Sequence, residues 1–324
     1  MNTLKFIFLG AAALLVSVTA VAQQIPLGNQ YLLNDFSLSP AYAGSNNNVE
    51  SILSYRKDWA GVTGSPESRM ININGSLPNI LGFLPKVPSN MGLGATILSE
   101  QSGMFRSTSF SLAYAYKLKI AAIQSLRLGV SVGLVENNVD MSKISTQQAS
   151  DPALMAANDV RKTVFDASFG VLYQFQNLDF GITIPRLVES KVKDDNSNSV
   201  YTMSRHYVIH TSYYFNINKN FQVKPYVIAR TTGSSPFMFE VMAQVKYQKK
   251  YWIGLLYRKT SMGMSLGGEL FNMIALNYSY EFAGQGLMSQ SNGTHEITLG
   301  FKIGKKDEDV PAASPKKPYY DWVK

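Results

Sequence analysis

Strict alternation runs through the segment Phe237-Met-Phe-Glu-Val-Met-Ala-Gln-Val-Lys-Tyr247. Every odd-numbered residue in it is apolar or aromatic, whereas the even-numbered residues include Glu240, Gln244 and Lys246. Side chains of a β-strand point alternately to its two faces, so a period of two predicts a strand with a different solvent on each face.

The same alternation recurs along the chain from residue 49 onward. It divides this part into fourteen segments separated by clusters of Gly, Asn, Ser and Pro, at 49–59, 67–77, 90–100, 106–119, 124–138, 163–175, 178–185, 204–216, 221–232, 237–247, 251–259, 262–270, 274–282 and 294–303. No long segment of helical periodicity interrupts them. The pattern predicts an all-β meander.

Segment length and aromatic placement favour a membrane barrel over a soluble sandwich. About ten residues are what a tilted strand needs to cross a bilayer, whereas soluble strands are usually shorter. Aromatic residues such as Tyr114, Tyr213 and Tyr247 gather at segment ends, as expected at the two interfaces. We therefore predict a transmembrane antiparallel β-barrel of about 14 strands over residues 49–304, located in the outer membrane. Because the connections alternate between short and long, both termini are expected in the periplasm.

The two ends of the chain have different compositions. Residues 1–22 combine a basic start, an apolar core and an Ala20-x-Ala22 end, which predicts a cleaved signal peptide. Residues 23–48 precede the first strand and form either a small plug in the barrel or a periplasmic arm. Residues 305–324 are rich in proline and mixed charge, which predicts a periplasmic C-terminal tail.

Two apolar segments are candidates for binding a protein partner. The connection 78–89 belongs to the set that should be short, yet it is long and apolar; a loop folded under the barrel mouth explains it equally well. The tail ends in clustered aromatic residues, which often supply binding hot spots but also occur in disordered ends. The candidate partner-binding residues are Ile80, Leu81, Phe83, Leu84, Tyr319, Tyr320 and Trp322.

Strand register predicts a row of charges on the inner wall. Pairing Tyr247 with Tyr251 sets Glu240 opposite Arg258, and Arg230 lies about two residues from that level. Pairing across residues 271–273 sets Glu281 beside Gly263, which the same count sets opposite Arg258. Because a lone arginine facing lipid at the midplane would cost about 2 to 4 kcal/mol, these charges must face the lumen or each other. We favour a structural network of Arg230, Glu240, Arg258 and Glu281 over a ring that selects solutes.

Other chemistry has weak support in the sequence. His206 and His210 would share a face of one strand, but no third ligand is evident, so we expect no metal site. No catalytic motif stands out, and we expect neither an enzyme nor a cofactor. The formal net charge of +8 is scattered through aromatic segments, which argues against nucleic acid as a partner. The chain has no cysteine, which excludes disulfides and a lipoprotein anchor.

Two N-terminal motifs carry a family resemblance. The first reads Gln30-Tyr-Leu-Leu-Asn34-Asp-Phe-Ser-Leu-Ser39-Pro40-Ala41-Tyr42-Ala43-Gly44, and the second reads Tyr55-Arg56-Lys-Asp-Trp59-Ala-Gly61-Val-Thr-Gly64-Ser-Pro66. They resemble the PorP/SprF family of outer-membrane proteins from Bacteroidetes, in which asparagine usually stands where this chain has Ser39. The motif residues are Asn34, Pro40, Ala41, Tyr42, Gly44, Arg56, Trp59, Gly61, Gly64 and Pro66.

The resemblance implies a role with the type IX secretion and gliding machinery. Expected partners are its periplasmic or outer-membrane components, a secreted surface protein or adhesin, and outer-membrane lipid. The barrel would support export or surface retention of adhesins. The alternative is a passive outer-membrane channel or transporter for small or hydrophobic solutes.

Overall fold

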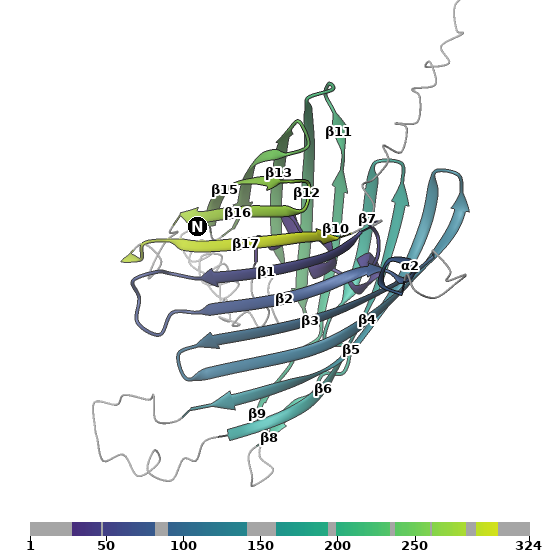
Figure 1. Cartoon of the computed structure of the whole chain (residues 1–324). Coiled ribbons are helices and arrows are strands. Elements are labelled where there is room, and N and C mark those ends of the chain that lie inside the picture. The colour runs from purple at the N-terminus through teal and green to yellow at the C-terminus, as the bar shows by residue number, and fades with distance from the viewer. Residues whose placement is uncertain are drawn as a thin grey trace, which may run out of the picture.

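The computed structural model describes residues 28–46, 48–81, 90–140, 160–193, 199–233, 237–259, 261–282 and 290–303. These residues form a closed antiparallel β-barrel of fourteen spanning strands (Figure 1). The predicted fold class is thus confirmed. The expected signal peptide and C-terminal tail lie outside the described residues.

Each spanning strand occupies one of the fourteen alternating segments, with ends that differ by a few residues. They are β1 (Val49–Lys57), β2 (Glu67–Ser76), β3 (Met91–Ser102), β4 (Phe105–Ala121), β5 (Gln124–Val139), β6 (Val160–Phe175), β7 (Leu178–Ile184), β10 (His206–Tyr213), β12 (Phe221–Thr232), β13 (Met238–Tyr247), β14 (Tyr251–Arg258), β15 (Ser261–Leu270), β16 (Ile274–Phe282) and β17 (Thr294–Ile303). Strand β11 (Phe215–Asn216) continues β10 past Tyr214 and also pairs with β12.

The sheet closes because every spanning strand has a neighbour on both sides, and the closing seam is the pair formed by the first and last strands. The first strand, β1, pairs with the last, β17, and β10 pairs with β7 on one side and β12 on the other. Closing the sheet removes its edges, so backbone groups facing lipid are paired. A separate hairpin of β8 (Lys191–Lys193) and β9 (Ser199–Thr202) lies in the 186–203 connection, where the sequence analysis expected no strand.

The two faces of the wall have the inverse of a soluble protein's polarity. Outward-facing Leu255 and Leu266 are 63% and 61% exposed, whereas inward-facing Gln244 and Thr298 are fully buried. Apolar side chains on the outside suit lipid, and buried polar side chains form the interior. The period of two in the sequence therefore arises because one face of each strand contacts lipid and the other faces a filled lumen.

Helical structure is minor. In the described ranges it consists of α2 (Leu77–Ile80) and three short 3-10 helices, η1 (Gln30–Leu32), η2 (Asp35–Ser37) and η3 (Pro40–Tyr42). In the part of the chain that the structure describes, no helix is long and apolar enough to cross a membrane.

Candidate functional site

Residues 28–45, here called the lumen segment, lie inside the barrel. Figure 1 shows the backbone of this segment, in dark purple, among the strands of the barrel. Tyr31, Leu32 and Phe36 are buried, as are most of their neighbours in the segment. Tyr31 and Leu32 pack with apolar side chains of β10, β12, β13 and β14. Phe36 and residues 41–43 pack with β4 and β6 on the opposite wall. The lumen segment thus joins two walls that are far apart in the sequence.

Inward-facing glycines give the lumen segment its room. A Cβ atom on Gly129 of β5 would lie 2.2 Å from the backbone nitrogen of Ala41, and one on Gly92 of β3 would lie 2.0 Å from the carbonyl oxygen of Ala43. Real Cβ atoms essentially never come this close to other atoms, so the backbone of residues 41–43 can approach β3 and β5 at these two positions because they carry no side chain. These glycines were not identified as site residues from the sequence.

Hydrogen bonds fix η3 against the same wall. The Arg127 guanidinium donates to the carbonyl oxygens of Ala41 at 2.9 Å and Ala43 at 2.5 Å. Ser39 occupies the N-cap position of η3, and its Oγ accepts from the Ala41 backbone N–H at 3.3 Å. Asparagine caps helix ends as well as serine does, so the departure from the family motif at Ser39 keeps the same local role.

The structure brings the four predicted lumen charges together. Glu240 forms an ion pair with each of two arginines. Its Oε2 lies 2.8 Å from Arg258 Nε, and its Oε1 lies 2.8 Å from Arg230 Nη2. Arg258 Nη1 also contacts Glu281 Oε1 at 2.9 Å. The side chains of Glu240, Arg258 and Glu281 are each at most 4% exposed, so these are buried ion pairs.

One step of the register prediction is wrong. Glu240 does lie opposite Arg258 and Glu281 does lie opposite Gly263. Arg258, however, pairs with Ser261, and Gly263 pairs with Leu256. The connection between β14 and β15 is therefore two residues tighter than expected. Because the shift is even, every side chain keeps its face, and the ion pair with Glu281 still forms.

The ion network is larger than the sequence analysis predicted. Arg56 of β1 contacts Glu281 at 2.6 Å and Glu296 of β17 at 3.1 Å, and it also pairs with Asp58. Arg56 and Glu296 are direct cross-strand partners across the closing seam. Both stand at inward positions of their strands, so applying the register argument to the first and last strands would have found them.

The lumen segment takes part in this network directly. Asn29 donates its backbone N–H to Glu296 at 2.8 Å and its Nδ2 to Glu281 at 2.9 Å. The Tyr31 hydroxyl donates to Glu240 at 2.5 Å and accepts from Arg258 at 2.7 Å. Burial raises the pKa of Tyr31 well above its usual range, so this hydroxyl stays a neutral donor.

A second ion pair holds the middle of the segment. Lys224 Nζ of β12 lies 3.0 Å from Asp35 Oδ2, and the Tyr226 hydroxyl donates to Asp35 Oδ1 at 3.0 Å. A cavity of about 210 Å³ adjoins these residues at the rim where β1 begins and β17 ends; Trp252 and Lys302 also line it. We call this end of the barrel the C-terminal rim.

The candidate partner-binding residues that the structure describes and the two histidines lie outside the ion network. Ile80 and Leu81 are half-buried at the end of α2, whereas Phe83, Leu84, Tyr319, Tyr320 and Trp322 lie outside the described residues. His206 and His210 are buried on the inner face of β10, and the His210 ring lies 5.5 Å from the ring of Tyr42. Within the described ranges, no group of three His, Cys, Asp or Glu side chains could hold a metal ion.

The motif residues fall into two places. Asn34, Pro40, Ala41, Tyr42 and Gly44 belong to the lumen segment, and all except Gly44 are buried. Trp59, Gly61, Gly64 and Pro66 form the β1–β2 connection, where Trp59, Gly61 and Gly64 have positive φ angles. Arg56 belongs to neither group: it lies near the end of β1, and its side chain reaches into the lumen network.

Comparison with known families agrees with these placements. The family model described as type IX secretion system membrane protein PorP/SprF matches residues 20–301. The chain belongs to the PorP/SprF family. Both motif groups lie within the matched range, as does every strand of the barrel except the last two residues of β17. No curated protein sequence shows detectable similarity to this PorP/SprF member.

Solved structures with the same fold are distant in sequence. The CymD monoaromatic hydrocarbon channel is 10% identical with a TM-score of 0.50, and the match covers 88% of this chain and 95% of that one. The toluene transporter TbuX from Ralstonia pickettii is also 10% identical, with a TM-score of 0.48 and coverage of 89% and 97%. At this identity the likeness to CymD describes the barrel fold alone.

Proposed function

We propose that this PorP/SprF barrel works as a partner-binding component of the type IX secretion machinery and supports export or surface retention of secreted adhesins. Both termini face the periplasm in this proposal. Partners dock at the C-terminal rim, at the connection 78–89 and at the tail 305–324.

The filled lumen is the observation that carries the proposal. The lumen segment is tied to the wall by Arg127, by the Asp35–Lys224 pair and by the network around Arg258. Removing it would leave several buried charges without their partners, which is costly. A barrel filled in this permanent way favours a scaffold at the membrane over a conduit for solutes.

The alternative, a passive channel for small or hydrophobic solutes, makes a different prediction. A conduit needs a path past the lumen segment, so the purified protein would give stable single-channel currents in a planar bilayer. A scaffold would give few or none. The Gly129→Val variant, which displaces η3, serves as the positive control for an unblocked lumen.

A complementation experiment tests partner binding. The gene is deleted and replaced by the full chain, or by a chain carrying Tyr319→Ser, Tyr320→Ser and Trp322→Ser together. Surface proteins exported by the type IX machinery are then measured by protease shaving of intact cells and mass spectrometry. The matched control, Lys316→Ser with Lys317→Ser, alters the same tail without removing its aromatic residues.

We expect the deletion to lose surface display of at least one exported protein, and the full chain to restore it. The aromatic variant should restore it poorly and the lysine variant fully. A second variant, Ile80→Ser with Leu81→Ser, tests the loop in the same way. Unchanged display in the deletion strain would refute the proposed function, and full rescue by the aromatic variant would exclude the tail as a docking segment.

A further inference from the structure

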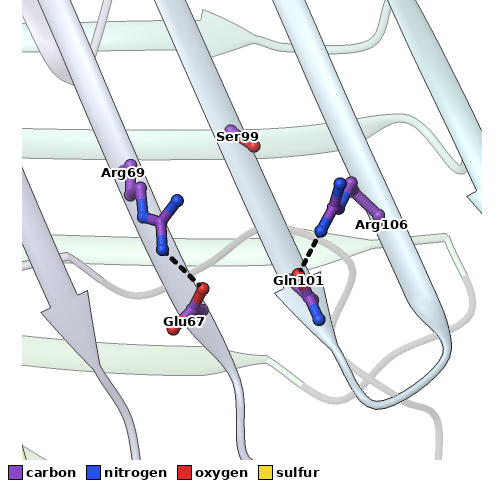
Figure 2. A pocket seen from close by; sticks show the side chains of 5 residues that line it. All are labelled: Glu67, Arg69, Ser99, Gln101 and Arg106. Atoms are coloured by element: carbon purple, nitrogen blue, oxygen red, sulfur yellow. Dashed lines mark hydrogen bonds and ion pairs between the residues drawn. The ribbon is translucent and has the colours of Figure 1, made fainter.

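A polar pocket lies on the outer surface of the barrel, at the rim opposite the C-terminal rim. Figure 2 shows its lining, with Arg69 of β2 and Arg106 of β4 on either side of Ser99 of β3. Glu67 and Gln101 complete it, and the hollow measures about 110 Å³. All five side chains stand at outward positions, in register with one another across β2, β3 and β4.

The two arginines are close enough to bind one anion. Arg69 pairs with Ser99, which pairs with Thr108 of β4. Arg106 lies two residues before Thr108 on the same strand, nearer the rim. Two strand spacings of about 4.8 Å and two residues of about 3.4 Å set their Cα atoms about 12 Å apart. Two extended arginine side chains can span that distance and converge over the small side chain of Ser99.

The charge around the pocket is not balanced. Arg69 contacts Glu67 at 3.0 Å, and the same carboxylate lies 3.8 Å from Lys57. Arg106 donates only to the neutral amide of Gln101, at 2.8 Å, and none of the described carboxylates pairs with it. Arg161, two strands away on β6, already has Glu136 as its partner. The Arg106 guanidinium therefore keeps free donors for an anion.

The pocket begins where the apolar outer band ends. Outward positions of β4 below it are apolar or aromatic from Phe110 through Leu112 and Tyr114 to Ile120. The ten residue steps from Phe110 to Ile120 rise about 34 Å along the strand, or about 25 Å in height at the usual tilt, which matches the apolar band of outer-membrane barrels. Thr108 and Arg106 are the next two outward positions, so the pocket lies at headgroup level.

We propose that this pocket binds the phosphate of a phosphorylated glycolipid in the outer leaflet, with its acyl chains lying on the apolar residues Ile97, Phe110 and Leu134 below. These three side chains are exposed and lie side by side in the register, directly beneath the pocket. The bidentate guanidinium geometry suits a phosphate, and the adjoining apolar surface favours a lipid over a free anion. The choice of leaflet rests on the periplasmic termini of the proposed function.

Native mass spectrometry of the full mature chain in detergent tests this inference. The probes are diphosphoryl lipid A, the same lipid A with its phosphates removed, phosphatidylglycerol and inorganic phosphate. The test variant is Arg69→Gln with Arg106→Gln. The control, Lys219→Gln, removes a positive charge from an exposed turn at the C-terminal rim. Heat-dependent gel migration confirms that each variant forms the barrel.

Diphosphoryl lipid A should bind the wild-type chain and the control equally, and the double variant at least about tenfold more weakly, because two charge-assisted contacts are lost. The dephosphorylated lipid should not distinguish them. Equal binding of diphosphoryl lipid A by wild type and double variant overturns the site. Tighter binding of phosphatidylglycerol overturns the outer-leaflet assignment, and displacement by millimolar inorganic phosphate overturns the lipid assignment. The surface-display experiment measures partner binding independently of lipid. A negative result for lipid A binding therefore does not affect the proposed partner role.

Discussion

Replacing Glu240 by glutamine is the sharpest test of the lumen network. Glu240 is 1% exposed, forms an ion pair with Arg230, and accepts hydrogen bonds from Arg258 and Tyr31. Glutamine keeps the shape but removes the charge, and it offers an NH₂ group to partners that are themselves donors. One of the three contacts is therefore lost outright, and two arginines lose a counter-charge.

The expected cost follows from the burial of the pair. Breaking a buried ion pair by removing one partner typically costs about 3 to 5 kcal/mol, because the remaining charge stays desolvated. Arg258 keeps Glu281 as a partner, which places the Glu240→Gln cost at the lower end, about 3 kcal/mol. With a urea slope of about 3 kcal/mol per molar, the midpoint of unfolding should fall by about 1 M.

The assay is urea unfolding in lipid vesicles, followed by the fluorescence of the chain's 3 tryptophans. The matched control is Glu136→Gln, since Glu136 pairs with Arg161 at the surface, where that arginine is 70% exposed. Exposed pairs contribute at most about 1 kcal/mol, so this control should barely move the midpoint. Bilayer conductance should stay unchanged in both variants, because the lumen segment keeps its contacts with Arg127. An unmoved midpoint for Glu240→Gln, or a large rise in conductance, would refute a structural role for the network.

Three further substitutions probe how the lumen segment is held. Gly129→Val should displace η3, because even a Cβ at this position would lie 2.2 Å from the Ala41 nitrogen; limited proteolysis within residues 28–45 should accelerate severalfold. Arg127→Met should cost about 2 to 3 kcal/mol in the same urea assay, since two buried carbonyl oxygens lose a charged donor. Ser39→Asn should leave the thermal unfolding midpoint within a degree or two of wild type, whereas Ser39→Ala should lower stability by about 1 kcal/mol.

Much of the barrel could be predicted because successive side chains of each strand face lipid and the lumen in turn. Lipid outside and a polar interior force alternation, and a short turn fixes the register of the strands that it joins. Counting back from Tyr247 and Tyr251 therefore sets Glu240 against Arg258 correctly. The same count fails at Gly263, because sequence does not distinguish a two-residue connection after Arg258 from a longer one.

The position of the lumen segment could not be predicted from alternation. Residues 28–45 have no alternation, and their position depends on contacts with strand residues 30 to 267 positions away in the sequence, which local patterns do not encode. A signal did exist on the receiving strands, where Gly92 and Gly129 stand at inward positions that elsewhere carry larger side chains. An inward glycine in a barrel strand can mark a place where another backbone approaches the wall.

The buried charges of the inner wall and the lumen segment stabilise each other, because each provides hydrogen-bond partners for the other. Glu281 of β16 and Glu296 of β17 lie on neighbouring strands beside the closing seam, and their cationic partners among the described residues are Arg56 and Arg258. Asn29 adds an N–H to each carboxylate, and Arg258 in turn donates to the Gly28 carbonyl at 3.0 Å. The charges thereby hold a backbone that has no strand partners of its own, and that backbone provides hydrogen-bond partners for buried charged groups of the inner wall. Closure of the first and last strands and seating of the lumen segment therefore use the same carboxylates, so the two events should be a single cooperative step in folding.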